Sequence, residues 1–337
     1  MTKAKSAVTT LDYRSSEPLP AWVNEVLNAH LAIEAEDAKS AGALGFMARA
    51  LVIATMPYKD PKADAFVRTN GDFRLRIVAG YEGGIPYGIY PRLLMSWVAT
   101  EAVRKQSPVI ELGDSLSVFL REVLNLRSRG GGERGSSTRV IEQMKRLFGS
   151  LVTASYTGTQ EHKGFVLKNI LIADELDLDD VEMDQLSRKI YKEDGEQLWT
   201  PQTKSEAGKW RSQVRLSNNF FKECITNPVP IDLRAYKALR ASPLAMDVYT
   251  WLTYRMSYTQ RRSRPIRWES LMMQFGSAFN PNDIDQAVRD FKKAFLRALK
   301  LVLVVYPQAG VELSPNGLVL LPSRPHVLPA KGQRALF

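Results

Sequence analysis

One order of predicted elements occurs twice along this chain of 337 residues. In each copy a helix leads through a short strand or turn to a second helix. A third helix follows, with one apolar face and one basic face, and then a β-hairpin. The first copy spans residues 91–172 and the second spans residues 243–321. The repeated layout predicts an α+β fold that contains two similar domains.

The third helix of the second copy has the clearest pattern. From Ile284 onward, large apolar residues recur at helical spacing and define a face for the core. Cations recur on the opposite side, and no acid follows Asp290 within the helix to pair with them. For this helix alone, a solvated amphipathic helix is the competing interpretation. The core face comprises Ile284, Val288, Phe291, Phe295 and Leu299, and the basic face comprises Arg289, Lys292, Lys293, Arg297 and Lys300.

The third helix of the first copy is similar, with Val140, Met144 and Leu147 in its apolar stripe. Residues 127–135 precede it and are rich in arginine and in glycine, which lets the backbone approach a phosphate closely. These glycines can also form a plain loop. A nucleotide-binding loop that cradles phosphates is the sharper alternative, but the missing Gly-Lys-Ser/Thr ending counts strongly against it. The candidate DNA contacts of this copy are Arg129, Arg134, Ser136, Ser137, Thr138, Arg139, Gln143, Lys145, Arg146 and, near the hairpin tip, Lys163.

Helix-turn-helix followed by a hairpin is the winged-helix plan, and the basic third helix is where such a domain meets DNA. We therefore expect tandem winged-helix domains that bind double-stranded DNA at more than one groove segment. Contacts of Lys and Arg with phosphates would make the affinity depend on salt. Further basic residues after the first helix of the second copy are Arg261, Arg262 and Arg264. The candidate base-reading residues are Arg139, Gln143, Arg289 and Lys293.

The overall charge agrees with this expectation. The formal net charge is +10, and the isoelectric point is near 9.6. A basic balance of this size favours nucleic acid or an acidic membrane surface as a partner. No apolar run approaches the roughly 20 residues that span a bilayer, and the polar start of the chain predicts no signal peptide. Together with the single cysteine, these features predict a cytoplasmic protein that does not contact a membrane.

The residues that usually build metal and catalytic sites are sparse. Three histidines stand far apart in the sequence at positions 30, 162 and 326, and no Cys/His cluster exists to hold zinc. Cys224 lies in an apolar run and is expected in the core rather than beside a histidine as a nucleophile. Nicking initiators pair two histidines on a strand with a nucleophilic tyrosine, and this chain lacks the pair. We therefore expect no catalytic residue, no metal and no cofactor, and a protein that is not an enzyme.

An acidic run between Asp174 and Asp184 is the one remaining candidate for a metal site. Its spacing lacks the central glycine of a calcium loop, so a solvated segment that leaves the first domain is the better interpretation. Such a segment could also keep the linker off DNA or pair with a basic patch of the protein. The expected organisation is a partly disordered arm with one helix at 1–40, winged-helix domains at 41–178 and 211–322, a linker at 179–210 and a loose tail at 323–337.

Several short strings along the chain are distinctive when taken together. They are Ile85-Pro86-Tyr87-Gly88, Pro91-Arg92-Leu93-Leu94, Thr100-Glu101-Ala102-Val103-Arg104, Leu112-Gly113-Asp114-Ser115-Leu116-Ser117, Gln143-Met144-Lys145-Arg146-Leu147-Phe148, Arg267-Trp268-Glu269-Ser270-Leu271 and Asp290-Phe291-Lys292-Lys293-Ala294-Phe295. Together these strings resemble the RepA-type plasmid replication proteins. The resemblance covers roughly residues 41–322, and one departure is the arginine- and glycine-rich turn at residues 127–135.

This resemblance implies a replication initiator with tandem winged helices. Such a protein would bind short direct repeats at a plasmid origin and open nearby A·T-rich DNA. It would recruit the host initiator and the replicative helicase, and a homodimer of it could repress its own gene. A sequence-specific transcriptional repressor with the same fold is the alternative, because both functions need the same DNA-binding surface.

Overall fold

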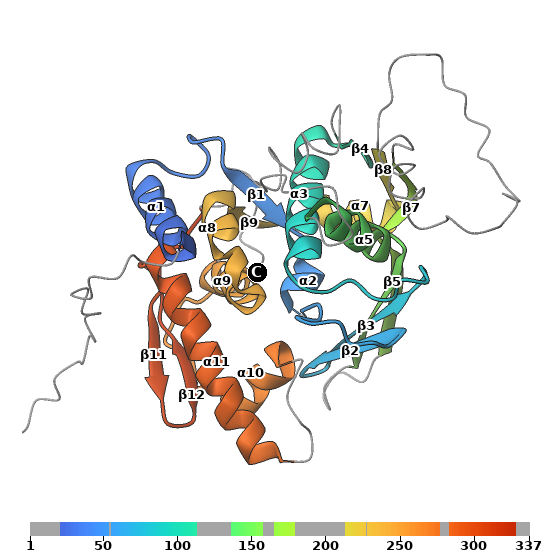
Figure 1. Cartoon of the computed structure of the whole chain (residues 1–337). Helices are drawn as coiled ribbons and strands as arrows, with labels where there is room; N and C mark the ends of the chain where they lie inside the picture. The colour runs from blue at the N-terminus through green and yellow to red at the C-terminus, as the bar shows by residue number, and fades with distance from the viewer. Residues whose placement is uncertain are drawn as a thin grey trace, which may run out of the picture.

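The computed structural model describes residues 21–53, 55–112, 136–157, 165–178, 213–226, 228–276 and 283–327 (Figure 1). We use "first half" for elements β1 to α7 and "second half" for elements β9 to β12. The first half contains β1 (Leu44–Met47), α2 (Arg49–Ile53), β2 (Ala65–Asn70), β3 (Phe73–Ala79), α3 (Ile89–Lys105), β4 (Val109–Glu111), α5 (Ser136–Phe148), β5 (Ser150–Thr157), β6 (Phe165–Leu171), β7 (Ala173–Asp177), β8 (Gln213–Leu216) and α7 (Asn218–Thr226).

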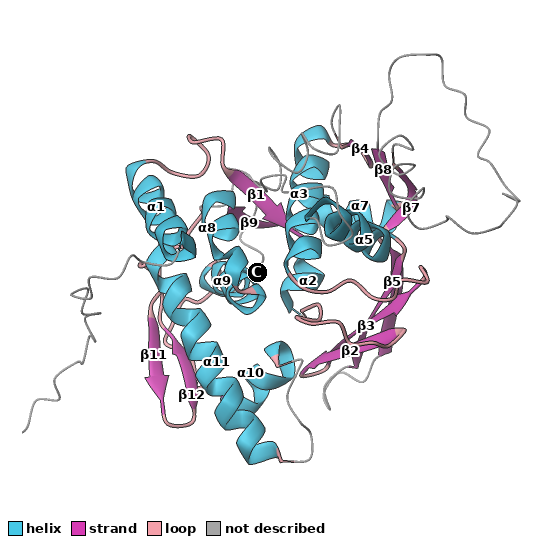
Figure 2. Ribbon diagram, viewed as in Figure 1, coloured by secondary structure: helices cyan, strands magenta, loops and turns pink. Residues whose placement is uncertain are grey.

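The second half is mainly helical, and α1 from the start of the chain packs against it (Figure 2). The mixture of helices and strands confirms the expected α+β composition. These remaining elements are α1 (Ala21–Ala35), β9 (Val229–Asp232), α8 (Leu233–Ala238), the 3-10 helix η2 (Leu239–Ala241), α9 (Pro243–Met256), β10 (Ile266–Arg267), α10 (Trp268–Phe275), α11 (Ile284–Val305), β11 (Val311–Ser314) and β12 (Gly317–Leu320).

The two copies of the repeated layout are not equivalent. In the first half, β4 pairs with β8 in the sheet β4-β8-β7, whereas the hairpin β5–β6 joins β3 in the sheet β2-β3-β5-β6. In the second half, β10 pairs with the hairpin itself in the sheet β10-β12-β11. Strand β8 follows the expected linker, and its position predicts a place in the second domain (211–322), but it belongs to a sheet of the first half.

In the four-stranded sheet β2-β3-β5-β6, apolar and charged residues alternate along strand β3. Leu75 and Ile77 are buried, whereas Arg74 and Arg76 between them are exposed. This is the two-residue period of a strand with one face on the core, as the sequence predicts for residues 72–78. Helices α2, α3 and α5 lie on the buried face of this sheet (Figure 2).

Helix α11 is longer than its sequence pattern suggests. In the sequence, the β-branched residues Val302, Val304 and Val305 predict a strand over residues 302–306. This prediction is wrong: α11 continues to Val305, and the hairpin strand begins at Val311. Val302 and Val305 are fully buried in a helix that packs against α9 and α1, so tertiary packing outweighs the local β preference.

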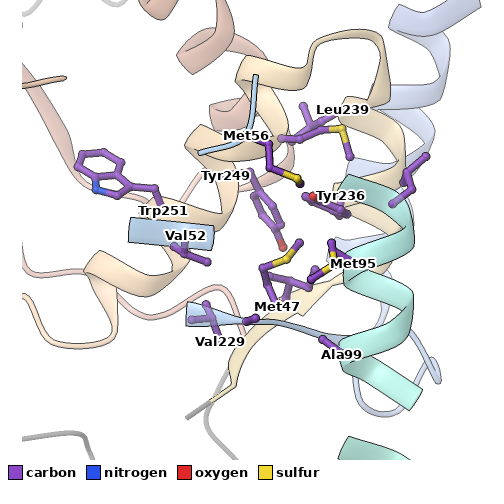
Figure 3. Packing of buried hydrophobic residues seen from close by; sticks show 14 of the residues in the cluster. Met47, Val52, Met56, Met95, Ala99, Val229, Tyr236, Leu239, Tyr249 and Trp251 are labelled. Atoms are coloured by element: carbon purple, nitrogen blue, oxygen red, sulfur yellow. The ribbon is translucent and has the colours of Figure 1, made fainter. Parts of the chain in front are cut away.

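The two halves share one hydrophobic core. Strands β1 and β9 pair antiparallel across the halves. Figure 3 shows side chains from both halves packed together, including Met47 and Met95 from the first and Tyr236, Tyr249 and Trp251 from the second. Because the contacts are continuous, the halves form a single packed unit in the described structure.

The expected linker does not separate two bodies. Strands β7 and β8 are paired antiparallel, and Asp177 lies opposite Gln213. The chain therefore leaves and re-enters the same sheet, and residues 178–212 need not connect one half to the other. Four segments lie outside the described residues. They are the arm at 1–20, the second helix of the first copy, the hairpin tip at 158–164 and the short helix that the sequence pattern predicts at 184–191.

Replacing residues 178–212 by the two-residue turn Asn-Gly should leave the fold intact. Asn-Gly matches the twist of an antiparallel hairpin, and shortening the closed loop should lower its entropic cost by about 2 kcal/mol. We expect equal or higher thermal stability by circular dichroism. An insoluble or unfolded product would show that this segment does hold the halves together.

The C-terminal segment is docked as far as Val327, rather than loose from residue 323. The hydroxyl of Tyr306 donates a 2.7 Å hydrogen bond to the carbonyl oxygen of Arg324. His326 packs against the Tyr306 ring with centroids 4.6 Å apart, and its Nδ1 lies 2.7 Å from the Tyr249 hydroxyl oxygen. Val327 is buried.

The half-buried position of His326 should make folding sensitive to mild acid. Burial lowers the pKa of His326 to about 4, while the Asp232 charge raises this pKa and the Arg234 charge lowers it. The unfolded chain takes up the proton near pH 6.5, so stability falls as the pH drops from about 6.5 towards 4. We expect the melting temperature to fall between pH 7.5 and pH 5, and to fall less in His326→Phe. An identical pH dependence in both proteins would contradict this assignment.

Candidate nucleic-acid interface

The core face of α11 fixes how the helix is rotated. The Asp283 side chain caps the helix by accepting a 2.9 Å hydrogen bond from the backbone N–H of Gln286. Phe291 and Phe295 are fully buried, as the sequence predicts. The Phe295 ring lies 5.7 Å from the Phe275 ring and 6.0 Å from the Trp268 ring, both on α10. This aromatic packing holds the opposite face of α11 towards solvent.

Four cations form a continuous exposed stripe on that solvent face. At 100° and 1.5 Å per residue, they fall within an arc of about 80° and extend over about 16 Å. None of them makes an ion pair with another described residue, although the Arg289 guanidinium donates to Gln286 Oε1 at 2.9 Å. We call these residues the α11 stripe: Arg289, Lys293, Arg297 and Lys300.

Lys292 is only half-buried beside this stripe and has a structural contact. Its Nζ lies 5.0 Å from the centre of the Trp268 ring. A cation over an aromatic face is stabilised by the ring quadrupole, so Lys292 helps to hold α10 against α11. Among the predicted basic-face residues of this helix, the four of the α11 stripe are the exposed ones.

A second group of cations lies between α9 and α10. Arg261, Arg264 and Arg267 are exposed. Arg262 is also exposed, but it donates to Glu312 Oε2 of β11 at 2.8 Å and is therefore partly neutralised. An open depression of about 420 Å³ lies between this segment and the hairpin tip, and it is lined by Pro265, Arg267, Trp268, Glu269, Pro315 and Asn316.

In the first half, the polar side of α5 is covered by the segment that precedes α3. The side chain of Gln143 is 5% exposed, and its Oε1 accepts a 2.9 Å hydrogen bond from the backbone N–H of Tyr87. Glu142 Oε2 accepts a 3.4 Å hydrogen bond from the hydroxyl of Tyr81. In this structure, therefore, Gln143 is not exposed for base reading, in contrast to the sequence expectation.

Two cations of α5 are likewise engaged. Arg146 is 13% exposed, donates to Glu142 at 2.9 Å, and lies 5.2 Å from the centre of the Tyr87 ring. Lys145 is half-buried, with its Nζ 5.9 Å from the Tyr81 ring centre. The sequence could not show this cover, because residues 81–87 are distant from α5 along the chain.

The other predicted contacts of the first copy divide into two groups. Arg139 is exposed, and Thr138 is half-buried and has an interaction partner. Ser136 and Ser137 belong to the first turn of α5, but their side chains lie outside the described part of the structure. Arg129, Arg134 and Lys163 also lie outside it. The roles of these residues stay predictions.

A buried ion pair between α3 and α9 fixes the two halves to each other. Asp247 accepts hydrogen bonds from Nε and Nη2 of Arg92, both at 2.8 Å. The remaining N–H groups of Arg92 donate to the carbonyl oxygens of Met56, Pro57 and Gly88 at 2.6–3.1 Å. All five donors of the guanidinium are therefore satisfied. Burial raises the pKa of Asp247, and the Arg92 charge opposes that rise.

Further buried polar groups surround this pair. The Tyr58 ring lies 4.9 Å from the Arg92 guanidinium, and burial raises the pKa of the Tyr58 hydroxyl well above its ordinary value. Arg68 of β2 donates to the carbonyl oxygen of Gly276 at 3.1 Å, and burial lowers its pKa. This contact between β2 and the end of α10 therefore also holds the first half against the second half.

No metal-binding or membrane-spanning feature is visible in the described ranges. No group of three or more His, Cys, Asp or Glu side chains there is placed to hold a metal ion. No described helix is both long enough and apolar enough to cross a bilayer. Cys224 is fully buried in the core, as expected, and burial raises the pKa of its thiol.

Comparison with known proteins places these features in a family. The family profile of plasmid-encoded RepA proteins matches residues 85–185 and, in a second overlapping segment, residues 177–270. Together the two segments cover more than half of the chain. This chain belongs to the plasmid-encoded RepA family. The RepA match includes Arg92 and Asp247 and ends within α10, so the α11 stripe lies beyond it.

Two crystal structures of domains 2 and 3 of RctB are also similar to this chain. The first has 12% sequence identity and a TM-score of 0.42, and the alignment covers 74% of this chain and 83% of the RctB chain. The second has 10% identity and the same TM-score, with 80% and 94% covered. No curated protein sequence matches this chain significantly.

Proposed function

We propose that this protein is a plasmid replication initiator that binds repeats in double-stranded origin DNA through its second half. Membership of the RepA family supports the replication role. The α11 stripe is the observation that carries the DNA-binding role, because it places four unpaired cations along one exposed helix face. No acid follows Asp290 within α11, and none of the four cations forms an ion pair with a described residue.

The order of elements in the second half supports a winged-helix interpretation. A helix, a short strand and two further helices precede a hairpin, and β10 completes the hairpin sheet. In this arrangement α11 is the helix that enters the major groove. The hairpin tip at Pro315 and Asn316 then lies beside the same DNA segment.

The α11 stripe has the chemistry for both parts of DNA recognition. Arginine and lysine neutralise phosphates and release counterions, and each such contact should contribute about 0.9 to the salt slope of binding. Arg289 and Lys293, near the N-terminal end of the helix, are the candidates for base edges, because recognition helices read bases with their N-terminal residues. Arg297 and Lys300 then contact the backbone.

The first half has a different role in this proposal. Helix α5 is covered by residues 81–87, so it does not act as a second groove-reading helix in this conformation. The shared core and the Arg92–Asp247 pair instead hold the first half in a defined position beside the bound duplex. Opening of A·T-rich DNA, dimerisation, and recruitment of a host initiator and helicase extend the proposal, and only the resemblance to RepA-type proteins supports them.

Plasmid maintenance tests this function directly. A plasmid whose only origin is the DNA flanking this gene should replicate when the protein is supplied and should be lost when it is absent. Persistence of the plasmid without the protein would favour the repressor alternative. Incubation of supercoiled origin DNA with the protein and Mg²⁺ should give no nicked product, because we propose a binding role without catalysis.

A further inference from the structure

The outer face of the sheet β2-β3-β5-β6 is open to solvent. The helices α2, α3 and α5 lie on the other face, and no described helix is drawn over the outer one (Figure 2). Side chains on the outer face form cross-strand rows set by the strand register. One row is Val67, Arg76, Thr153 and Asn169, and the next contains Thr69, Arg74 and Ser155.

The central strand of this face carries two free arginines. Arg74 and Arg76 are exposed, and neither makes an ion pair or hydrogen bond with another described residue. They stand two residues apart on β3, which separates their Cα atoms by about 6.7 Å. Their neighbours in the two rows are one apolar side chain, Val67, together with three hydroxyls and the amide of Asn169, to which Thr153 donates at 2.8 Å. No acid occupies an outward position in the described register of this sheet.

We propose that this open sheet face is a second DNA contact, which takes the phosphate backbone of a double helix. The proposal rests on the DNA-binding function argued above and adds a surface to it. Arginine, serine, threonine and asparagine are the side chains that contact phosphates in DNA complexes. A face of this composition with no acid has the charge complementarity that a polyanion requires.

Because residues 81–87 cover the polar side of α5, the open sheet face is the exposed basic surface through which we expect the first half to contact DNA. The cations that the sequence assigns to DNA binding in the first half are engaged at Lys145 and Arg146, whereas Arg74 and Arg76 are free. The first half therefore meets DNA through a sheet rather than through a helix. A surface of this kind contributes affinity without reading the sequence, because it contacts the backbone and not base edges.

A protein partner is the competing occupant of this face. Val67 is 38% exposed and Leu171 is 47% exposed, and apolar side chains on an open sheet can bind another protein. The two arginines on β3 favour DNA, because phosphates supply their counter-charges, whereas an apolar protein surface would bury both charges unpaired. The experiment below separates the two occupants.

The test compares the variant Arg74→Thr/Arg76→Thr with Arg74→Lys/Arg76→Lys. Threonine suits an exposed strand position, so the fold should be kept, and unchanged circular dichroism and melting temperature verify this. Binding to the flanking DNA is measured by fluorescence anisotropy across a series of salt concentrations. We expect the threonine variant to bind about 10-fold more weakly, with a salt slope lower by about 2. The lysine variant should keep most of the affinity.

The possible outcomes separate this proposal from the function on which it rests. Equal affinity of the wild-type protein and the threonine variant would overturn the sheet contact while leaving the initiator proposal intact. If the threonine variant binds DNA with wild-type affinity but differs from the wild-type protein in its oligomeric state, measured by sedimentation, the sheet contact with DNA is also overturned. That result would assign the face to a protein partner. Failure of the wild-type protein to bind the flanking DNA at all would reject the DNA-binding function itself.

Discussion

Asp247→Ala should lower the free energy of unfolding by about 3–5 kcal/mol, the largest stability effect that we expect from a single substitution. The change leaves the Arg92 guanidinium buried without its counter-charge, although three backbone carbonyls still accept from it. A loss of this size should reduce the melting temperature by roughly 10 °C. Urea unfolding followed by circular dichroism measures it.

A matched double variant shows whether the loss comes from the unpaired charge. Arg92→Met/Asp247→Leu removes both charges and keeps apolar volume at the contact between α3 and α9. Replacing a buried ion pair by apolar residues is often close to neutral, so the double variant should be more stable than Asp247→Ala. If the double variant is the less stable protein, the pair contributes net stability and the unpaired charge is not the main cost.

Replacing Arg289, Lys293 and Arg297 together with alanine should weaken DNA binding about 100-fold or more at physiological salt. Three phosphate or base contacts are lost, so the slope of log affinity against log salt should also fall by about 2–3. These side chains are exposed, and the core face with Phe291 and Phe295 is untouched. The melting temperature should therefore stay within a few degrees of the wild-type value.

A charge-matched control excludes a general effect of net charge. Lys39, Lys105 and Lys222 are exposed on other parts of the molecule, and replacing them with alanine removes the same total charge. This control should bind DNA nearly as well as the wild-type protein. Similar losses in both triple variants would show that the α11 stripe is not a specific contact surface.

The sequence predicts the local elements of the second half well. Helical spacing predicts α9, α10 and the start of α11, and the burial of Phe291 and Phe295 follows from the same spacing. The end of α11 is missed because a run of β-branched residues is compatible with either a strand or a buried helix. Its contacts with α1 and α9, which decide between the two, come from distant parts of the chain.

Long-range pairing explains most of what the sequence could not predict. The β4–β8 pairing joins residues that are about 100 positions apart, and Asp247 is 155 positions from Arg92. A lone arginine among apolar residues, as in Pro91-Arg92-Leu93-Leu94, indicates a buried partner without identifying it. The cover over α5 is also non-local, so a basic helix face that looks free in the sequence is engaged in the fold.

The sequence predicts the exposed residues of the candidate DNA-binding site only where their side chains make no contact with other elements. The α11 stripe follows from helical periodicity, because exposure there depends only on which face the core residues occupy. Arg74 and Arg76 could be assigned to one strand face, but their availability depends on a sheet whose outer face is left uncovered. The sequence pattern alone does not supply that information.

Site-specific photocrosslinking is the most direct test of DNA contact by the α11 stripe. A photoreactive side chain placed at Arg297 should crosslink to the flanking duplex, and one placed at Lys39 should not. Crosslinking at position 297 that is lost at high salt is the result we predict. Stable DNA binding with no crosslink at 297, or with equal crosslinking at both positions, would contradict the proposed orientation of the protein on DNA.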